Sequence, residues 1–187
     1  MGIILLGIWW VMSAGLRYVR VTNATIDVQR SCLIALARVT QELAEANQFG
    51  LETTGSEVIF SSPRDDSGIL RFDVANRLLW HKVVAFYVET VNGVPCLMRK
   101  EKMLPKPLSK APAPPPISSI RNDGSLVPRV VAQNIATFTV VHDNPDDPST
   151  PLDNFLTITA ISELRTIESR VGKDFQVKIT TSVTLKN

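Results

Sequence analysis

The chain has 187 residues, of which 44% are hydrophobic and 20% are charged. This length fits one domain of ordinary size plus an extended element, and the apolar content is enough for a packed core, which argues against a disordered chain. The formal net charge of +2 is too small to indicate a nucleic-acid-binding protein, and no basic cluster with interleaved aromatic residues is present. We therefore expect a folded protein that does not bind nucleic acid.

The first fifty residues read as one long helix. Residues 1–16 carry no charged side chain, and they continue without a proline into an amphipathic stretch that reaches Phe49. We predict a continuous helix from about Ile3 to Asn47, with Gly50 as the residue that ends it. At 1.5 Å per residue this helix is roughly 70 Å long, so part of it must protrude from a single domain into lipid or partner subunits.

Residues 1–22 are predicted to be a membrane and assembly stem. The apolar run is shorter than the roughly 20 residues that span a bilayer. A secretory signal peptide has basic residues before its apolar segment, and here none precedes it. A buried core helix is the ordinary alternative. We expect instead that Met1 is an internal methionine and that the stem is incomplete. In this stem, small residues would allow neighbouring helices to approach closely, and large apolar residues would contact lipid or neighbouring helices. The predicted stem residues are Gly2, Ile3, Leu6, Gly7, Trp9, Trp10, Ala14 and Gly15.

Residues 23–49 are predicted to be the amphipathic half of the same helix, lying against the rest of the protein. Large apolar residues recur there at helical spacing. We expect four of them to pack on a sheet: Ile26, Leu33, Leu36 and Leu43. The two cysteines, Cys32 and Cys96, are interpreted as separate buried thiols, with a disulfide as the alternative in an oxidising compartment.

Residues 50–187 change to the alternating pattern of β-strands. Asn92-Gly93 is a strong hairpin signal between two of them. Residues 127–141 are predicted to start as a helical turn and end as a strand. The other expected strands are 57–61, 69–74, one within 77–90, 95–102, 155–163 and 175–185. The predicted fold class is α+β, with a long N-terminal helix packed on one antiparallel sheet.

Two segments interrupt the strand pattern. Residues 104–119 contain six of the 12 prolines, and we interpret them as a solvated surface loop with polyproline character, with an SH3 or WW ligand as the functional alternative. Residues 143–153 are rich in aspartate, so a calcium site is an alternative to an ordinary loop. The carboxylate spacing does not match an EF-hand, and we expect no cofactor.

The sequence offers no catalytic constellation. The two histidines, His81 and His142, have no zinc-site spacing, and no phosphate-binding glycine loop, nucleophile elbow or Cys-x-x-Cys motif is present. We therefore expect a non-catalytic protein.

A long helix that is half stem and half spine, followed by antiparallel strands, resembles the type IV pilin-like family, in particular its minor pilins and the minor pseudopilins of type II secretion. The apolar residues 1–8 resemble the middle of that family's hydrophobic segment, and residues 30–43 resemble its spine helix. Strand 80–88 followed by Leu97-Met98-Arg99, and the final strand ending in Lys186-Asn187, are also similar to the family. The family's processing motif, glycine followed by Phe-Thr-Leu-x-Glu, is absent, and no glutamate occurs before Glu42.

The resemblance implies a structural subunit of a type IV pilus or a type II secretion pseudopilus. Its partners would be other pilin-like subunits, an inner-membrane assembly platform and, before assembly, membrane lipid. It would be a single-pass inner-membrane protein whose β domain, residues 50–187, is extracytoplasmic. The competing hypothesis is a membrane-anchored or secreted extracytoplasmic β-rich binding domain.

Overall fold

The structure, a computed structural model, describes residues 2–142, 155–164 and 175–185. It consists of one long helix and eight strands in these residues, with two short helical segments between them. The elements are α1 (Gly2–Leu43), η1 (Gln48–Gly50), β1 (Leu51–Thr53), β2 (Val58–Ser62), β3 (Trp80–Val91), β4 (Val94–Leu108), α2 (Ile117–Arg121), β5 (Arg129–Gln133), β6 (Ile135–His142), β7 (Phe155–Leu164) and β8 (Phe175–Thr184).

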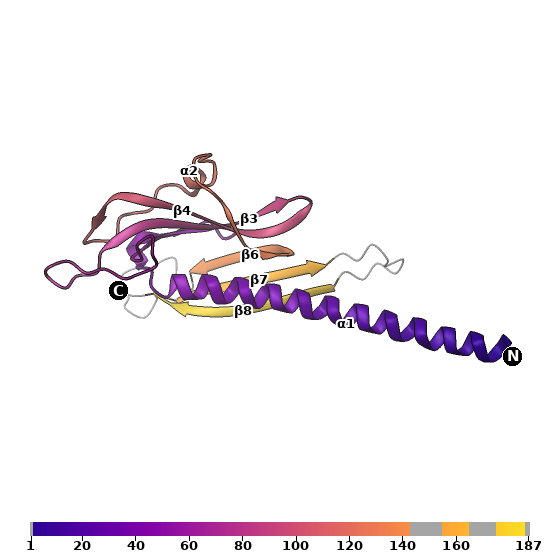
Figure 1. The fold of residues 1–187 in the computed structure, drawn as a ribbon. Helices are drawn as coiled ribbons and strands as arrows, with labels where there is room; N and C mark the ends of the chain where they lie inside the picture. The colour runs from indigo at the N-terminus through magenta and orange to yellow at the C-terminus, as the bar shows by residue number, and fades with distance from the viewer. Residues whose placement is uncertain (1, 143–154, 165–174, 186–187) are drawn as a thin grey trace.

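The strands form two antiparallel sheets. The larger has the order β1-β2-β3-β4-β5 and the smaller the order β6-β7-β8. The C-terminal half of α1 contacts β5, β7 and β8, whereas its N-terminal half extends well beyond both sheets (Figure 1). The α+β class and the long N-terminal helix are confirmed, but the helix packs against two sheets where we expected one.

The division into two sheets occurs at Asn134. This residue has a φ of 60° and lies between β5, in the larger sheet, and β6, in the smaller one. Asparagine tolerates this left-handed conformation better than most residues. The prediction of a helical turn within residues 127–141 is therefore wrong, because both halves of that segment are strands.

The expected hairpin at Asn92-Gly93 is confirmed. Val91 pairs with Val94, and the two turn residues have φ angles of 51° and 81°. Positive φ at both central residues is the geometry of a type I′ turn, whose twist matches that of the flanking strands. The turn therefore sets the register of β3 and β4, the longest strand pair in the described part of the protein.

The expected strand 69–74 is not found. Residues 63–79 form an ordered loop whose strand-like pairs are isolated bridges, Arg64 with Leu70 and Phe72 with Leu78. The apolar alternation that predicted a strand leaves Ile69, Phe72 and Val74 exposed, so this loop presents apolar side chains to the surface.

The proline-rich segment is less of a loop than predicted. β4 continues to Leu108 through Pro105 and Pro107, which lie beyond the residues of β4 that pair with β5, so their missing N–H groups break no pairing on that side. At the other end, α2 begins at Ile117, which is buried. Between them the Pro112 carbonyl accepts a hydrogen bond from Ser61 Oγ at 3.0 Å, which ties the segment to β2.

Gly50 does not end α1. The helix stops at Leu43, and Asn47 caps the following short helix η1 by accepting a hydrogen bond from the backbone N–H of Phe49. Gly50 is buried, and a Cβ at this position would lie 3.1 Å from Ala111 Cβ and 3.2 Å from Ser61 Cβ. A side chain at this position would therefore press against Ser61 and the closely approaching proline-rich segment, a contact that glycine avoids.

The main core lies where α1 and the two sheets meet. Its members are fully or nearly fully buried aliphatic and aromatic side chains, and Phe60 stacks with Phe86 at a centroid distance of 6.1 Å. Each sheet contributes one face to this core, and α1 contributes one stripe. The core residues are Cys32, Ala35, Leu36, Val39, Leu43, Ala46, Val58, Phe60, Val84, Phe86, Leu97, Ala132, Ile135, Phe138, Val140, Leu156, Ile158, Ala160, Val183 and Leu185.

Candidate functional site

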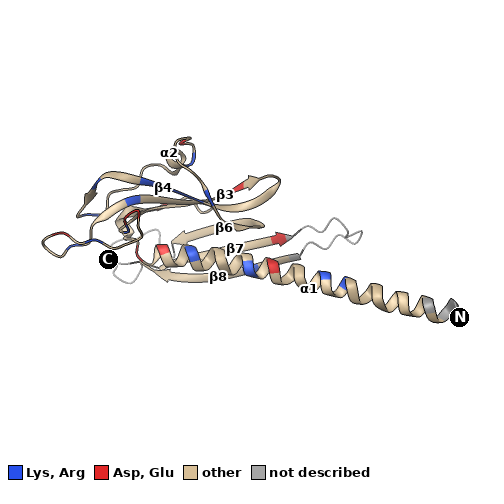
Figure 2. Cartoon of the chain, in the orientation of Figure 1, with Lys and Arg blue, Asp and Glu red and all other residues tan. Residues whose placement is uncertain are grey.

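The most distinctive surface is the projecting half of α1. It carries large apolar side chains that no described part of the protein covers; Trp9 and Trp10 are 67% and 70% exposed. Figure 2 shows that this half of the helix lacks charged residues until the arginines that follow Leu16. The exposed apolar residues are Ile4, Leu6, Ile8, Trp9, Trp10, Val11, Met12 and Leu16.

These side chains surround the helix completely. Successive residues of an α-helix are rotated by about 100°, so the four consecutive residues from Ile8 to Val11 already point in all directions. A helix that lies on the surface of its own domain has one apolar stripe, whereas a helix that is apolar all round is normally buried. The projecting half therefore requires an apolar environment on every side. Within the described chain, however, no helix combines the length and the apolarity that crossing a bilayer demands.

The predicted stem residues lie in this projecting half. Leu6, Trp9 and Trp10 are exposed. A Cβ added to Gly7 or Gly15 would meet no atom within 4 Å, so neither glycine is required by a contact within the described protein. Gly2 and Ile3 belong to α1, but their side-chain environment lies outside the described part. Ala14 is also on the open helix surface.

The half of α1 that packs on the sheets uses a different face from the predicted one. Leu36 and Leu43 are buried as expected, at 5% and 0% exposure, but Ile26 and Leu33 are 53% and 58% exposed. The prediction for Ile26 and Leu33 is wrong because it followed the largest aliphatic residues, whereas much of the buried stripe consists of smaller ones. Most members of this stripe are three or four residues apart along the helix. They are Ala24, Val28, Cys32, Ala35, Leu36, Val39 and Leu43.

Cys32 shows why small residues occupy the buried stripe. Its thiol donates to the carbonyl oxygens of Ala160 at 3.6 Å and Val177 at 3.5 Å, in the neighbouring strands β7 and β8. A larger side chain would hold the helix away from these strands. Both Cys32 and Cys96 are free and buried, in agreement with the interpretation as separate thiols. Burial raises the pKa of the Cys32 thiol, which makes it a poor nucleophile.

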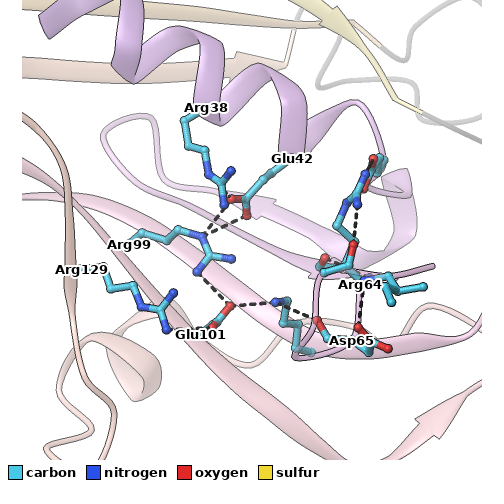
Figure 3. Close-up of polar contacts among 12 residues, drawn as sticks. Arg38, Glu42, Arg64, Asp65, Arg99, Glu101 and Arg129 are labelled. Atoms are coloured by element: carbon cyan, nitrogen blue, oxygen red, sulfur yellow. Dashed lines mark hydrogen bonds and ion pairs between the residues drawn. The ribbon is translucent and has the colours of Figure 1, made fainter. Parts of the chain in front are cut away.

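A chain of ion pairs, formed by the buried Glu42, Arg99 and Lys82 and the half-buried Glu101, fastens the C-terminal end of α1 to the larger sheet (Figure 3). Arg99 on β4 pairs with Glu42 on α1 at 3.0 Å and with Glu101 on its own strand at 2.8 Å. Glu101 in turn pairs with Lys82 on β3 at 2.9 Å. Burial opposes the ionisation of Glu101, but its pairs with Lys82 and Arg99 outweigh that effect and hold the pKa of its carboxyl below the ordinary value.

The ion pairs extend at both ends of this chain. At the helix, Arg38 pairs with Glu42 one turn away at 2.8 Å. At the sheet, the Lys82 ammonium donates to the Asp65 carbonyl at 3.3 Å, and the Asp65 carboxylate pairs with Arg71 at 2.9 Å. The helix end, the larger sheet and the loop 63–79 thus form one connected polar network that fixes the direction in which α1 leaves the domain.

Loop 63–79 is itself held in one shape by polar contacts. Asp65 accepts from the backbone N–H of Ile69 at 2.8 Å, and Asp73 accepts from the N–H groups of Ala75 and Arg77, each at 2.8 Å. These hydrogen bonds, together with the pairs to arginine, lower the pKa of both aspartates. The guanidinium of Arg64 also bonds to Glu45, just beyond α1. The apolar tip of the loop is therefore presented on a fixed framework.

The ion-pair network was not predicted from the sequence. Arg99 and Glu101 are two residues apart on a strand, so their side chains share one face of the sheet. The available signal was the run of four charged residues at 99–102 in β4, together with Glu42 and Arg38 on the last turns of α1. The strand periodicity alone could not show that this face meets the helix.

The structure and the comparisons add no enzymatic or metal-binding assignment. Among residues 2–142, 155–164 and 175–185, no group of three or more histidine, cysteine or acidic side chains is placed to hold a metal ion. The acidic segment 143–153, named as a calcium alternative, falls outside the described residues. No family model, curated protein or solved structure matches this chain. The projecting helix and its fixed attachment are therefore the features from which function is inferred.

Proposed function

We propose that this protein is a structural, non-catalytic subunit of the type IV pilin-like class, a minor pilin or a type II secretion minor pseudopilin. The observation that carries the proposal is that α1 leaves the domain with exposed apolar side chains on all sides. Such a surface is satisfied by lipid hydrocarbon or by a bundle of neighbouring helices, and a subunit that moves from membrane to fibre meets both.

The remaining architecture supports the same proposal. The second half of α1 lies along antiparallel strands, which is the arrangement that the resemblance to pilin-like proteins implies (Figure 1). The buried pair between Glu42 and Arg99, together with the buried stripe from Ala24 to Leu43, holds the helix at a fixed direction. A fixed direction matters for a subunit that is added to a fibre, because the position of the stem then sets the position of the β domain.

In this proposal the protein first resides in the inner membrane as a single-pass protein, with its β domain on the extracytoplasmic side. Its partners are other pilin-like subunits and the inner-membrane assembly platform. After assembly, the stems bury one another at the fibre axis, and the domain surfaces, including loop 63–79, face outward.

Deletion of residues 2–15 tests the proposal. None of the described side chains that are removed is buried, so we expect the domain to remain folded while incorporation into a pilus or pseudopilus is lost. The measurement is co-purification of tagged full-length and deleted forms with other pilin-like subunits, beside secretion or piliation. The matched control is Val127→Ser, which changes an exposed apolar residue far along the chain from the stem. Full activity of the deleted form would contradict the proposal.

A second candidate function is a membrane-anchored or secreted binding domain, and the tip of loop 63–79 favours it. Ile69, Phe72 and Val74 are exposed on a loop that is fixed by hydrogen bonds and ion pairs. A rigid apolar surface binds a partner at low entropic cost. This candidate predicts that Phe72→Ser with Val74→Ser abolishes function, while deletion of residues 2–15 leaves it intact in a form exported by another signal.

A further inference from the structure

The outer face of α1, which points away from the sheets, carries a second regular pattern. Starting at Met12, exposed residues recur alternately four and three positions apart as far as Ala37. This is the heptad pattern of a helix that packs against another helix along a left-handed seam. We call this set the outer stripe; its members are Met12, Leu16, Val19, Asn23, Ile26, Arg30, Leu33 and Ala37.

The outer stripe is not explained by the fold of the domain. Every one of its eight members is exposed, including Ile26 and Leu33, although both lie in the half of α1 that packs on the sheets. At about 100° per residue, Ile26 lies roughly 200° around the helix from the buried Val28. The α1 helix thus has two packing faces: an inner one for its own sheets and an outer one that no described residue covers.

Two polar residues interrupt the outer stripe, and they indicate what covers it. The outer stripe consists of two sets of positions, each repeating every seven residues. Asn23 and Arg30 belong to one set, and Val19, Ile26 and Leu33 belong to the other. Arg30 is exposed, and no described residue forms an ion pair with it. A polar or charged residue within an otherwise apolar seam stabilises only those partners that present a matching group opposite it.

We infer that the outer stripe is the docking surface for one parallel helix of a different subunit, which carries an acidic residue facing Arg30. This inference rests on the proposed function, because stems inserted in one membrane run parallel. It adds to that function a specific partner chemistry: an apolar heptad seam with a carboxylate opposite Arg30.

A second copy of the same chain fits the outer stripe less well. In a parallel, in-register pair, Arg30 of one copy would oppose Arg30 of the other. A shift by one heptad would place Arg30 opposite Asn23 or Ala37, neither of which carries a negative charge. Lipid fits less well still, because the outer stripe continues to Ala37 along only one face of a helix whose other face is buried, and it contains two polar residues.

The experiment uses full-length protein in detergent, with the wild-type chain and an Arg30→Glu variant each prepared with either of two affinity tags. Capture of one tag and quantification of the other measures each pairing. In the mixed pair, Arg30 of the wild-type chain faces the glutamate introduced in the variant, so opposite charges replace like ones. We therefore expect recovery of the mixed pair to be roughly tenfold greater than recovery of either pair of identical chains. The Arg30→Glu chain serves here as the probe for an acidic partner helix.

Two further variants show whether the outer stripe carries the pairing. Ile26→Ser with Leu33→Ser, placed in both chains, should abolish the mixed pair, whereas Val127→Ser with Val141→Ser, which changes exposed residues outside α1 and outside loop 63–79, should leave it unchanged. Unaltered thermal melting is expected for both, since all four side chains are exposed.

Three results would overturn the inference: wild-type chains that pair with themselves as well as with the variant, a mixed pair that survives the changes at Ile26 and Leu33, or no pairing in any combination. These results are separate from failure of the proposed function. Deletion of residues 2–15 leaves most of the outer stripe in place, so each experiment has its own outcome.

Discussion

Arg99 donates from Nε to both carboxylate oxygens of Glu42, at 3.0 and 3.1 Å. The two side chains are 7% and 9% exposed, and they join β4 to the end of α1. A buried pair of this kind contributes modestly to net stability, because desolvation of both charges offsets their attraction. Its effect is on specificity: only one rotation and one position of α1 bring Glu42 to Arg99.

Glu42→Leu is expected to destabilise the protein strongly. The substitution leaves Arg99 buried with fewer partners, and removal of one member of a buried ion pair costs about 3–5 kcal/mol. Denaturant unfolding of the full-length protein in detergent, followed by circular dichroism, measures the loss. The matched control is Arg77→Leu, which breaks the more exposed pair with Asp73 and should cost less than about 1 kcal/mol. Equal losses in the two variants would show that burial of the Glu42–Arg99 pair is unimportant.

Glu101 makes the stability dependent on pH in the acid range. Its folded-state pKa lies below the ordinary value of 4.5, so ionised Glu101 stabilises the folded protein. That contribution is complete above the unfolded-state pKa and is lost as the pH falls through the lowered folded-state value. We expect the melting temperature to decrease as the pH is lowered below about 4.5. The decrease should be less steep in Glu101→Gln, which is already destabilised at neutral pH. Identical pH profiles for wild type and variant would contradict this assignment.

The sequence predicted those parts of the fold that depend on local pattern. The Asn92-Gly93 turn requires positive φ at two residues, and the type I′ geometry follows from that requirement alone. The continuous α1 follows from uninterrupted helix-forming sequence. The choice of packing face did not follow, because apolar residues occupy both faces of α1. Which face meets the sheets is decided by how closely the helix can approach β7 and β8, and small residues such as Cys32 permit that approach.

The proline-rich segment illustrates a second limit. Its composition correctly indicates an extended backbone, but composition carries no information on what that backbone lies against. Contacts with Gly50 and Ser61, which are about fifty residues or more away in sequence, place part of the segment in the structure. The part of the segment around Ala111 and Pro112 is therefore packed against Gly50 and Ser61 and is not freely solvated.

Gly50→Ala tests this packing. The added methyl group would lie 3.1 Å from Ala111 Cβ and 3.2 Å from Ser61 Cβ, closer than carbon atoms normally approach. Because the backbone on both sides must shift, we expect a loss of about 1–3 kcal/mol in the free energy of unfolding. Gly124→Ala is the control, since a Cβ there meets nothing within 4 Å. A melting temperature for Gly50→Ala equal to that of Gly124→Ala would mean that the proline-rich segment moves aside freely.

Leu36 and Leu33 provide a matched pair for the two faces of α1. They are three residues apart on the same helix and chemically identical, yet Leu36 is 5% exposed and Leu33 is 58% exposed. Leu36→Asp places a charge among Val39, Phe86 and the other residues of the main core, so we expect a loss of several kcal/mol or failure to fold. Leu33→Asp exchanges one exposed side chain for another and should change the free energy of unfolding by about 0.5 kcal/mol or less.

The same pair separates folding from assembly. Leu33→Asp leaves the core intact but introduces a negative charge into the outer stripe, next to the position of the acidic residue expected on the partner helix. We therefore expect normal thermal melting together with loss of incorporation into the fibre, measured by co-purification with other pilin-like subunits. Because Leu36→Asp removes both properties and Leu33→Asp only one, a Leu33→Asp protein that incorporated normally would exclude the outer face of α1 as an assembly surface.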